Sequence, residues 1–263
     1  MTSRMRWLHW INWPGLLIMG LFAGAWEAAV RWSLLDYQYL PAPSAIAPGA
    51  RTLLTSGELI PNVLHTVLVT LIGWSVASAI GIALGLLLGL CPTAYRYSMT
   101  SFEVTKAIPP ITFVPATLLI FGFSLRMELV IVVYVGVWPV LINTIGGVRG
   151  VQVELLDVAR MLRMSRHDRV RKLIVPAAIP EIMVGVRLAL SLCLVLAVVA
   201  EMVGNPAGVG HALVLAQQAL QPEKMFAYVL SAGVLGITFN AVFRSAAAWI
   251  LPSPASGRGG GSP

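Results

Sequence analysis

The sequence predicts an all-α membrane protein with about six transmembrane helices. Of its 263 residues, 57% are hydrophobic and only 11% are charged. Its mean hydropathy of +0.82 is far above that of a water-soluble domain, which needs a polar exterior. Because each span needs roughly 20 apolar residues to cross the bilayer core, a chain of this length fits about six spans with short connections.

Six apolar runs are expected to form these spans. They cover residues 13–30, 63–90, 97–123, 127–148, 182–203 and 225–243. Residues 1–12 are expected to be a cytoplasmic N-terminus and residues 13–251 the transmembrane domain. Residues 252–263 are rich in Pro, Gly and Ser, which predicts a disordered tail. A short surface helix is expected over 44–56, and 204–224 is expected to be a loop marked by Gly and Pro.

The basic residues are distributed unevenly between the two sides of the predicted membrane domain. The net charge of +7 collects between apolar runs, which indicates the positive-inside rule and not nucleic-acid binding. One side holds the N-terminus, the loop at Arg96, the segment 149–172 and the C-terminus. The other side, which includes Arg51 and Lys224, has fewer Lys and Arg residues. Both termini are therefore predicted to be cytoplasmic.

Two patterns predict how the helices are shaped and packed. Small residues recur every four positions in the second run, at Ala77, Gly81, Gly85 and Gly89. They lie on one helical face, so another helix can approach closely. The third run is interrupted by Pro109, Pro110 and Pro115. Each proline removes a backbone donor, so this span is expected to be bent or locally unwound.

The segment 149–181 is the only long polar stretch in the interior of the chain. Its residues 153–163 have apolar side chains at helical spacing, which predicts a short amphipathic helix outside the membrane. A basic turn over 165–172 follows, and then Pro176 and Pro180, which are expected to end helices and to form a rigid, projecting elbow. Alternatively, the basic residues lie on anionic lipid, each contributing about 1 kcal/mol.

This segment also carries a family resemblance. Asp157-Val-Ala-Arg-Met-Leu-Arg163, followed by Ile174-Val-Pro176, resembles the EAA loop of ABC importer permeases that work with solute-binding proteins. In that pattern Asp157 replaces Glu, Val158 replaces Ala, and Arg163 replaces a Gly whose positive φ lets the chain turn. Because Arg tolerates this conformation poorly, the chain is expected to turn one residue later or to dock on a partner adapted to the change.

The resemblance implies a type I permease architecture in a bacterial inner membrane, with 13–251 as the permease domain and 149–181 as its coupling loop. It implies two copies of a separate ABC ATPase, a second permease subunit, and an extracytoplasmic solute-binding protein. A homodimer of permeases is expected, and a heterodimer is the open alternative. The residues expected to couple to the ATPase are Leu155, Asp157, Ala159, Arg160, Leu162, Arg163 and Pro176. Leu155, Ala159 and Leu162 would lie in a cleft of the ATPase. The permease itself would have no catalytic residue and no cofactor.

The segment Ala200-Glu201-Met202 and the Gly-rich loop after it look most like the branch of this family that imports nitrate, alkanesulfonates or taurine. This resemblance implies a small anionic solute. The alternative within the same importer class is a pyrimidine that resembles a thiamine precursor.

Three polar residues in the predicted spans are candidates for the translocation path. Arg187 lies one turn into the fifth span, where it either snorkels to the interface or lines the inner vestibule. Glu201, near the other end of that span, is either a gate, a contact of the binding protein or an exposed interfacial carboxylate. Asn143 needs a partner in an apolar setting, so it either joins helices or lines the path.

Neither a metal site nor an active site is predicted. Cys91 and Cys193 lie in apolar stretches and are assigned to packing, and His65 is assigned to the membrane interface. A membrane enzyme would need a nucleophile and base, or metal ligands, facing each other at membrane depth. A non-transporting scaffold would have no reason to carry the docking loop.

Overall fold

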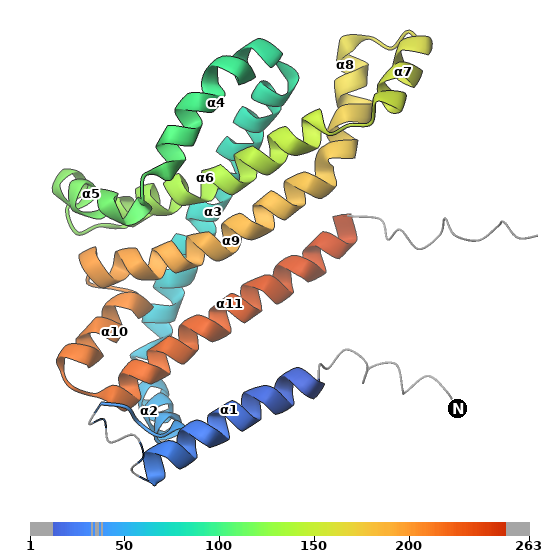
Figure 1. Cartoon of the computed structure of the whole chain (residues 1–263). Helices are drawn as coiled ribbons and strands as arrows, with labels where there is room; N and C mark the ends of the chain where they lie inside the picture. Colours follow the sequence, from blue (N-terminus) through green and yellow to red (C-terminus); the bar gives the residue numbers. More distant parts are fainter. Residues whose placement is uncertain (1–12, 33, 35–36, 38, 251–263) are drawn as a thin grey trace, which may run out of the picture. The chain divides into compact units, whose positions relative to one another are not determined.

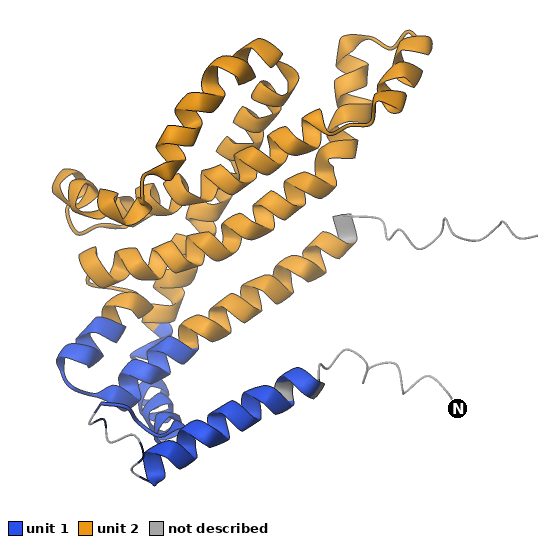
Figure 2. Cartoon of the chain, viewed as in Figure 1, with its two compact units in different colours: residues 1–60, 213–230 blue, residues 61–212, 231–263 orange. Residues whose placement is uncertain are grey.

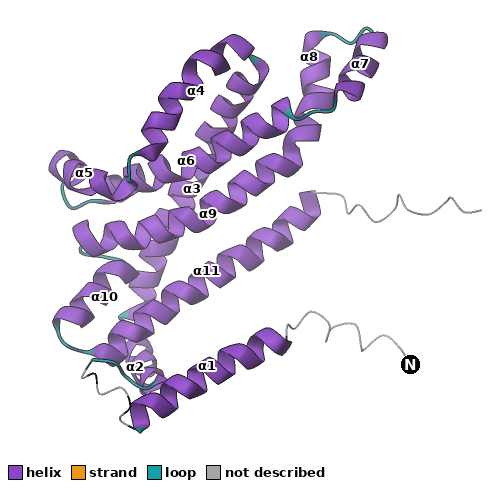
Figure 3. Cartoon of the chain, in the orientation of Figure 1, coloured by secondary structure: helices purple, strands orange, loops and turns teal. Residues whose placement is uncertain are grey.

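The computed structural model describes residues 13–32, 34, 37 and 39–250. The predicted N-terminus 1–12 and tail 252–263 therefore lie outside the described residues. Every regular element in the described part is helical (Figures 1 and 3). In order these elements are α1 (Trp13–Arg31), α2 (Pro43–Thr55), α3 (Leu59–Leu90), α4 (Pro92–Ala107), η2 (Pro110–Phe113), α5 (Val114–Phe121), α6 (Leu125–Arg149), α7 (Val153–Met161), α8 (Arg166–Arg169), η3 (Val170–Ile174), α9 (Val175–Gly204), α10 (Val209–Gln218) and α11 (Pro222–Ile250).

The chain divides into two compact units (Figure 2). Unit 1 comprises residues 1–60 and 213–230, and unit 2 comprises 61–212 and 231–263. Within unit 1, the Glu27 carboxylate of α1 accepts hydrogen bonds from the Ser44 hydroxyl at 2.7 Å and from the Ser44 backbone N–H at 2.9 Å. The N-terminus of α2 is thereby capped by a side chain of α1, because its first N–H groups have no partner within the helix.

The stripe of small residues predicted in the second span packs against α6. A Cβ atom added at Gly81 would lie 2.7 Å from Val140 Cβ, and one at Gly85 would lie 2.5 Å from Thr144 Cβ. Gly89 faces Val148 in the same way, so the contacts advance together along both helices. Helices α3 and α6 are therefore parallel, and the chain must cross back between them. The predicted close approach is confirmed.

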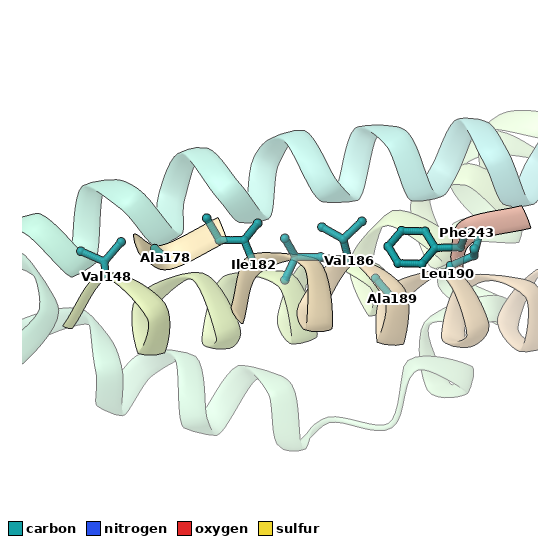
Figure 4. Packing of buried hydrophobic residues seen from close by; sticks show 8 residues of the cluster. Val148, Ala178, Ile182, Val186, Ala189, Leu190 and Phe243 are labelled. Carbon is teal, nitrogen blue, oxygen red and sulfur yellow. The ribbon is translucent and has the colours of Figure 1, made fainter. Parts of the chain in front are cut away.

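Helices α6 and α9 form an antiparallel pair that carries the main apolar core of unit 2. Gly147 near the C-terminal end of α6 contacts Ala178 near the start of α9, and Gly136 contacts Cys193 farther along. Seven core residues from α6, α9 and α11 are labelled in Figure 4: Val148, Ala178, Ile182, Val186, Ala189, Leu190 and Phe243. Cys193 is buried in this packing, as predicted, whereas Cys91 is exposed and its assignment to packing is wrong.

Four of the described helices are long and apolar enough to cross a membrane, and a fifth span results if α4 is joined to the η2–α5 segment. These two parts are bent by 79°, so the predicted break at Pro109 and Pro110 is confirmed. Pro115 lies in the first turn of α5, where a proline needs no N–H donor. Helix α1 coincides with the first expected span, and the total of about six stays a prediction.

Two expectations for the connecting segments are wrong. The predicted loop 204–224 contains the ten-residue helix α10. Pro176 and Pro180 do not end a helix, because residues 166–204 form one helix of 39 residues. The π turn η3 ends two residues before Pro176, and a widened turn relieves the clash between the proline ring and the carbonyl four residues earlier. At 1.5 Å per residue this helix is about 58 Å long, so part of it extends beyond the ~30 Å hydrocarbon core.

Candidate functional site

Helix α7 and the residue after it carry exposed apolar side chains on the segment between α6 and α9. The exposed side chains are those of Val153, Leu155, Val158, Met161 and Leu162. Met161 is the most exposed of them, at 82%. Ala159, by contrast, is only 1% exposed and is packed within this chain. The expectation that Ala159 lies in a cleft of a partner is therefore wrong. Helical spacing grouped it with Leu155 and Leu162, but the packing of the loop itself covers it.

Helix α7 ends at Met161, and Arg163, two residues later, has the geometry in which a glycine is usual. Arg163 has φ 49°, its N–H donates to the Arg160 carbonyl, and the Met164 N–H donates to the Ala159 carbonyl. This pair of bonds is the Schellman motif. The expectation that the chain turns one residue later is therefore wrong: the two terminal hydrogen bonds hold Arg163 in a conformation that costs an L-residue about 1–2 kcal/mol.

The charged side chains of this loop form local ion pairs on the surface. Arg160 contacts Asp157 at 2.7 Å, and Lys172 contacts Asp168 at 2.7 Å. Ser165 caps α8, since its hydroxyl accepts the Asp168 N–H. Part of the positive charge predicted for the loop is thus neutralised within the loop.

Arg187 and Asn143 both bond inside unit 2. The Arg187 Nε donates to Asn240 Oδ1 at 3.0 Å, which joins α9 to α11 beside an open groove lined in part by Pro180 and Arg244. The Asn143 amide donates to the Pro139 carbonyl of its own helix at 2.8 Å. Its amide therefore does not join two helices, although its Cβ lies against Gly185 of α9.

The opposite end of the α6–α9 pair holds a buried polar cluster, which we call the His65 cluster: His65, Glu128, Glu201, Asn205 and Thr66. His65 Nε2 lies 2.9 Å from Glu128 Oε2 and 3.1 Å from Asn205 Nδ2. Asn205 Nδ2 also donates to the other Glu128 oxygen. Glu201 Oε2 accepts from the Thr66 hydroxyl at 3.0 Å. Glu128 and Glu201 are fully buried.

The His65 cluster also determines where α10 begins. Glu201 Oε2 accepts the Gly210 N–H at 2.9 Å, and Thr66 Oγ1 accepts the Val209 N–H at 3.0 Å. A side chain at Gly208 would overlap the Glu201 carboxylate, and its φ of 99° also favours glycine. The carboxylate thus accepts one of the first N–H groups of the helix, which have no partner inside it.

This environment corrects the predictions for Glu201 and His65. Glu201 is neither an exposed interfacial carboxylate nor a surface available to a binding protein, because its side chain is fully buried. His65, which the sequence assigns to the membrane interface and not to a ligand role, contacts the buried Glu128 carboxylate. Sequence reasoning missed Glu128 altogether. The available signal was that all three residues lie near helix ends on the same expected membrane face, but their distant positions in the sequence hid the contact.

Comparison with known proteins identifies the fold and the family. Residues 77–255 match the family described as "Binding-protein-dependent transport system inner membrane component". The chain belongs to this family. It is the permease subunit of an importer and a multi-pass inner membrane protein. The permease of the MetNI methionine ABC transporter, in an inward-facing conformation, matches 71% of this chain and 95% of its own with a TM-score of 0.59. At 17% identity this match supports the type I permease fold alone.

Two relatives are similar along most of the permease. The SsuC protein of Bacillus subtilis, named for aliphatic sulfonates transport, is 31% identical over 222 residues, which cover 84% of this chain and 80% of the relative. The nitrate import permease NrtB of Leptolyngbya laminosa is 29% identical over 181 residues, or 69% of this chain and 65% of the relative. The predicted family and branch are confirmed.

Proposed function

We propose that the permease imports a small oxoanion and that α7 docks on a separate ATPase. The observation that carries the docking proposal is the set of exposed apolar side chains on α7, a short helix outside the predicted spans. Exposed apolar side chains outside the membrane gain free energy when a partner protein removes them from water. Docking would pass a rigid-body motion of the ATPase into α6 and α9, which flank the loop.

We choose the residues of the proposed docking surface by the exposure of their side chains. Leu155 and Leu162 from the predicted coupling set stay in the proposal, and Met161 and Val158 join them because they are exposed on the same helix. Asp157 and Arg160 would form the polar rim as a pair. Arg163 and Pro176 would act indirectly, by shaping the end of α7 and the start of α9. The polybasic alternative, in which this surface rests on lipid, is the competing explanation.

A charge placed on the exposed face distinguishes docking from lipid contact. Met161→Glu should remove the ATPase subunit that co-purifies with the wild-type permease, because docking would desolvate the new carboxylate. ATP-dependent uptake should fall with it. Leu54→Glu is the matched control, since Leu54 is 56% exposed on α2, which is predicted to lie on the other side of the membrane. If Met161→Glu inserts normally and retains both the ATPase and uptake, lipid contact replaces docking.

The assembly we infer has two permease subunits, two ATPase subunits and an extracytoplasmic solute-binding protein. The family description supports the binding protein, and the inner positions of the basic loops support cytoplasmic termini. Reporter fusions after Arg51 and after Lys172 should report opposite sides of the membrane. If both reported the same side, this topology would be rejected.

The substrate proposal is a sulfonate or nitrate-like anion. Both relatives described above are named for small oxoanions, and Arg187 beside the α9–α11 groove is the residue of the predicted path that suits an anion. Arg187→Gln should reduce uptake of labelled taurine and nitrate by the reconstituted importer, while Arg187→Lys should retain part of it. Uptake of a thiamine-precursor pyrimidine, with no uptake of either anion, would overturn this proposal in favour of the alternative.

A further inference from the structure

We propose that His65, Glu128 and Glu201 form a binding site for a divalent transition-metal cation. One imidazole nitrogen of His65 and one carboxylate oxygen from each glutamate all lie within 4.8 Å of one another. They come from three helices, α3, α6 and α9, near the ends opposite the α7 loop. Sequence analysis predicted no metal site, because no spacing between these residues indicates that they meet.

The charges in the cluster favour a bound cation. Glu128 and Glu201 are both fully buried, and their ionised forms would carry two negative charges into an apolar region. Among the described residues, the basic group with an ion-pair contact to either carboxylate is His65, which supplies one positive charge at most. Buried carboxylates persist when they are paired or coordinate a metal. A divalent cation would balance both.

The hydrogen bonds leave one Glu201 oxygen without a donor and one Glu128 oxygen with His65 as its only contact. Glu201 Oε2 is held by Thr66 and Gly210, while the buried Oε1 has no hydrogen-bond partner. In Glu128, one oxygen accepts from Asn205 and the other faces His65. This division is typical of metal ligands, in which a second group orients each carboxylate while its other oxygen binds the ion.

The contacts of His65 Nε2 fit the same arrangement. This nitrogen lies within hydrogen-bond distance of a Glu128 oxygen and of the Asn205 amide nitrogen. It can carry one hydrogen or one lone pair, so it cannot donate to Glu128 and accept from Asn205 together. With a cation in the cluster, Nε2 and Glu128 Oε2 would both direct lone pairs at the ion, and Asn205 would only orient Glu128.

The ligand set indicates the class of ion. Imidazole nitrogen suits Zn²⁺ and related transition metals, and carboxylate oxygen suits these as well as Mn²⁺. Neighbouring ligands around a tetrahedral ion at ~2.0–2.2 Å are about 3.4 Å apart, so the three side chains would have to move closer together to complete the site. Binding would tie the outer ends of α3, α6 and α9 together and fix the start of α10 through Glu201.

The test uses the full-length permease, purified with a tag that contains no histidine and treated with EDTA. Isothermal titration with Zn²⁺ and with Mn²⁺ should show one ion per chain for at least one of them, and Mg²⁺ should bind far more weakly. His65→Gln, Glu128→Gln and Glu201→Gln should each weaken binding by about tenfold or more. The glutamine variants keep an oxygen that accepts the existing hydrogen bonds, so they should fold.

Two controls keep the result interpretable. His211→Gln in α10 and Glu181→Gln in α9 remove one group of each type outside the cluster, and both should bind as the wild type does. Absence of binding by either ion at millimolar concentration would overturn the proposal. Binding that survives all three cluster substitutions would also overturn it, because the ion would be held elsewhere.

Discussion

The two polar regions of unit 2, the α7 loop and the His65 cluster, differ in how far their charged side chains are exposed to water. In the α7 loop, Asp157 pairs with Arg160 three positions away, and both side chains are largely exposed. In the His65 cluster, His65 meets Glu128 across 63 positions, and Glu128 is fully buried. Exposed local pairs contribute little because water solvates the separated charges equally well. Buried pairs are costly to break, because the remaining charge has no water to replace its partner.

The largest effect is therefore expected from the cluster. Glu128→Ala should lower the stability of the permease by about 3–5 kcal/mol, because it leaves His65 and Asn205 without their acceptor. The measurement is thermal unfolding of the purified protein in detergent. Asp168→Ala, which breaks an exposed pair with Lys172, should destabilise far less, because water solvates both separated charges. Equal effects of the two substitutions would contradict the comparison.

The α3–α6 contact tests how much stability is lost when a side chain is added where two helices pack closely. Gly85→Val should destabilise by about 1–3 kcal/mol, because the added Cβ would lie 2.5 Å from Thr144 Cβ. Gly233→Val is the control, since no atom lies within 4 Å of a Cβ added there. The same unfolding assay compares them. If both variants are equally stable, α3 and α6 are not as closely packed as the structure shows.

A smaller effect of opposite sign is expected at the end of α7. Arg163→Gly should stabilise the protein by about 0.4–1 kcal/mol, because glycine adopts the positive φ of this position without strain. Co-purification of the ATPase should be unchanged. Leu220→Gly provides a second test of the same conformation, with φ 55° at the end of α10. Destabilisation by Arg163→Gly would show that the arginine side chain makes a contact that outweighs the strain.

The smallest effect is expected for the exposed ion pair of α7. Asp157→Asn should change the free energy of unfolding by less than about 0.5 kcal/mol, and added salt should reduce even this difference. Unfolding at low and at high salt provides the measurement. A loss comparable to that of Glu128→Ala would mean that the loop is buried against another surface in the purified protein.

Sequence reasoning succeeded where a local property determines the structure. The four-residue spacing of Gly81 and Gly85 predicted a close helix contact, and the adjacent Pro109 and Pro110 predicted a broken span. It failed at Pro176, because a π turn accommodates a proline that would otherwise interrupt the helix. It also failed at Ala159, where helical spacing gives the face of a helix but not which neighbour covers that face.

The sequence by itself determined the membrane class, the all-α fold, the family and the position of the loop between α6 and α9. These follow from apolar length, periodicity and short motifs, all of which act between neighbouring residues. Only the tertiary structure decided that His65, Glu128 and Glu201 meet and that Glu201 starts α10. Their contact depends on the parallel register of α3 with α6 and on the antiparallel register of α6 with α9. Such registers are set by packing between helices far apart in the chain, which no local pattern encodes.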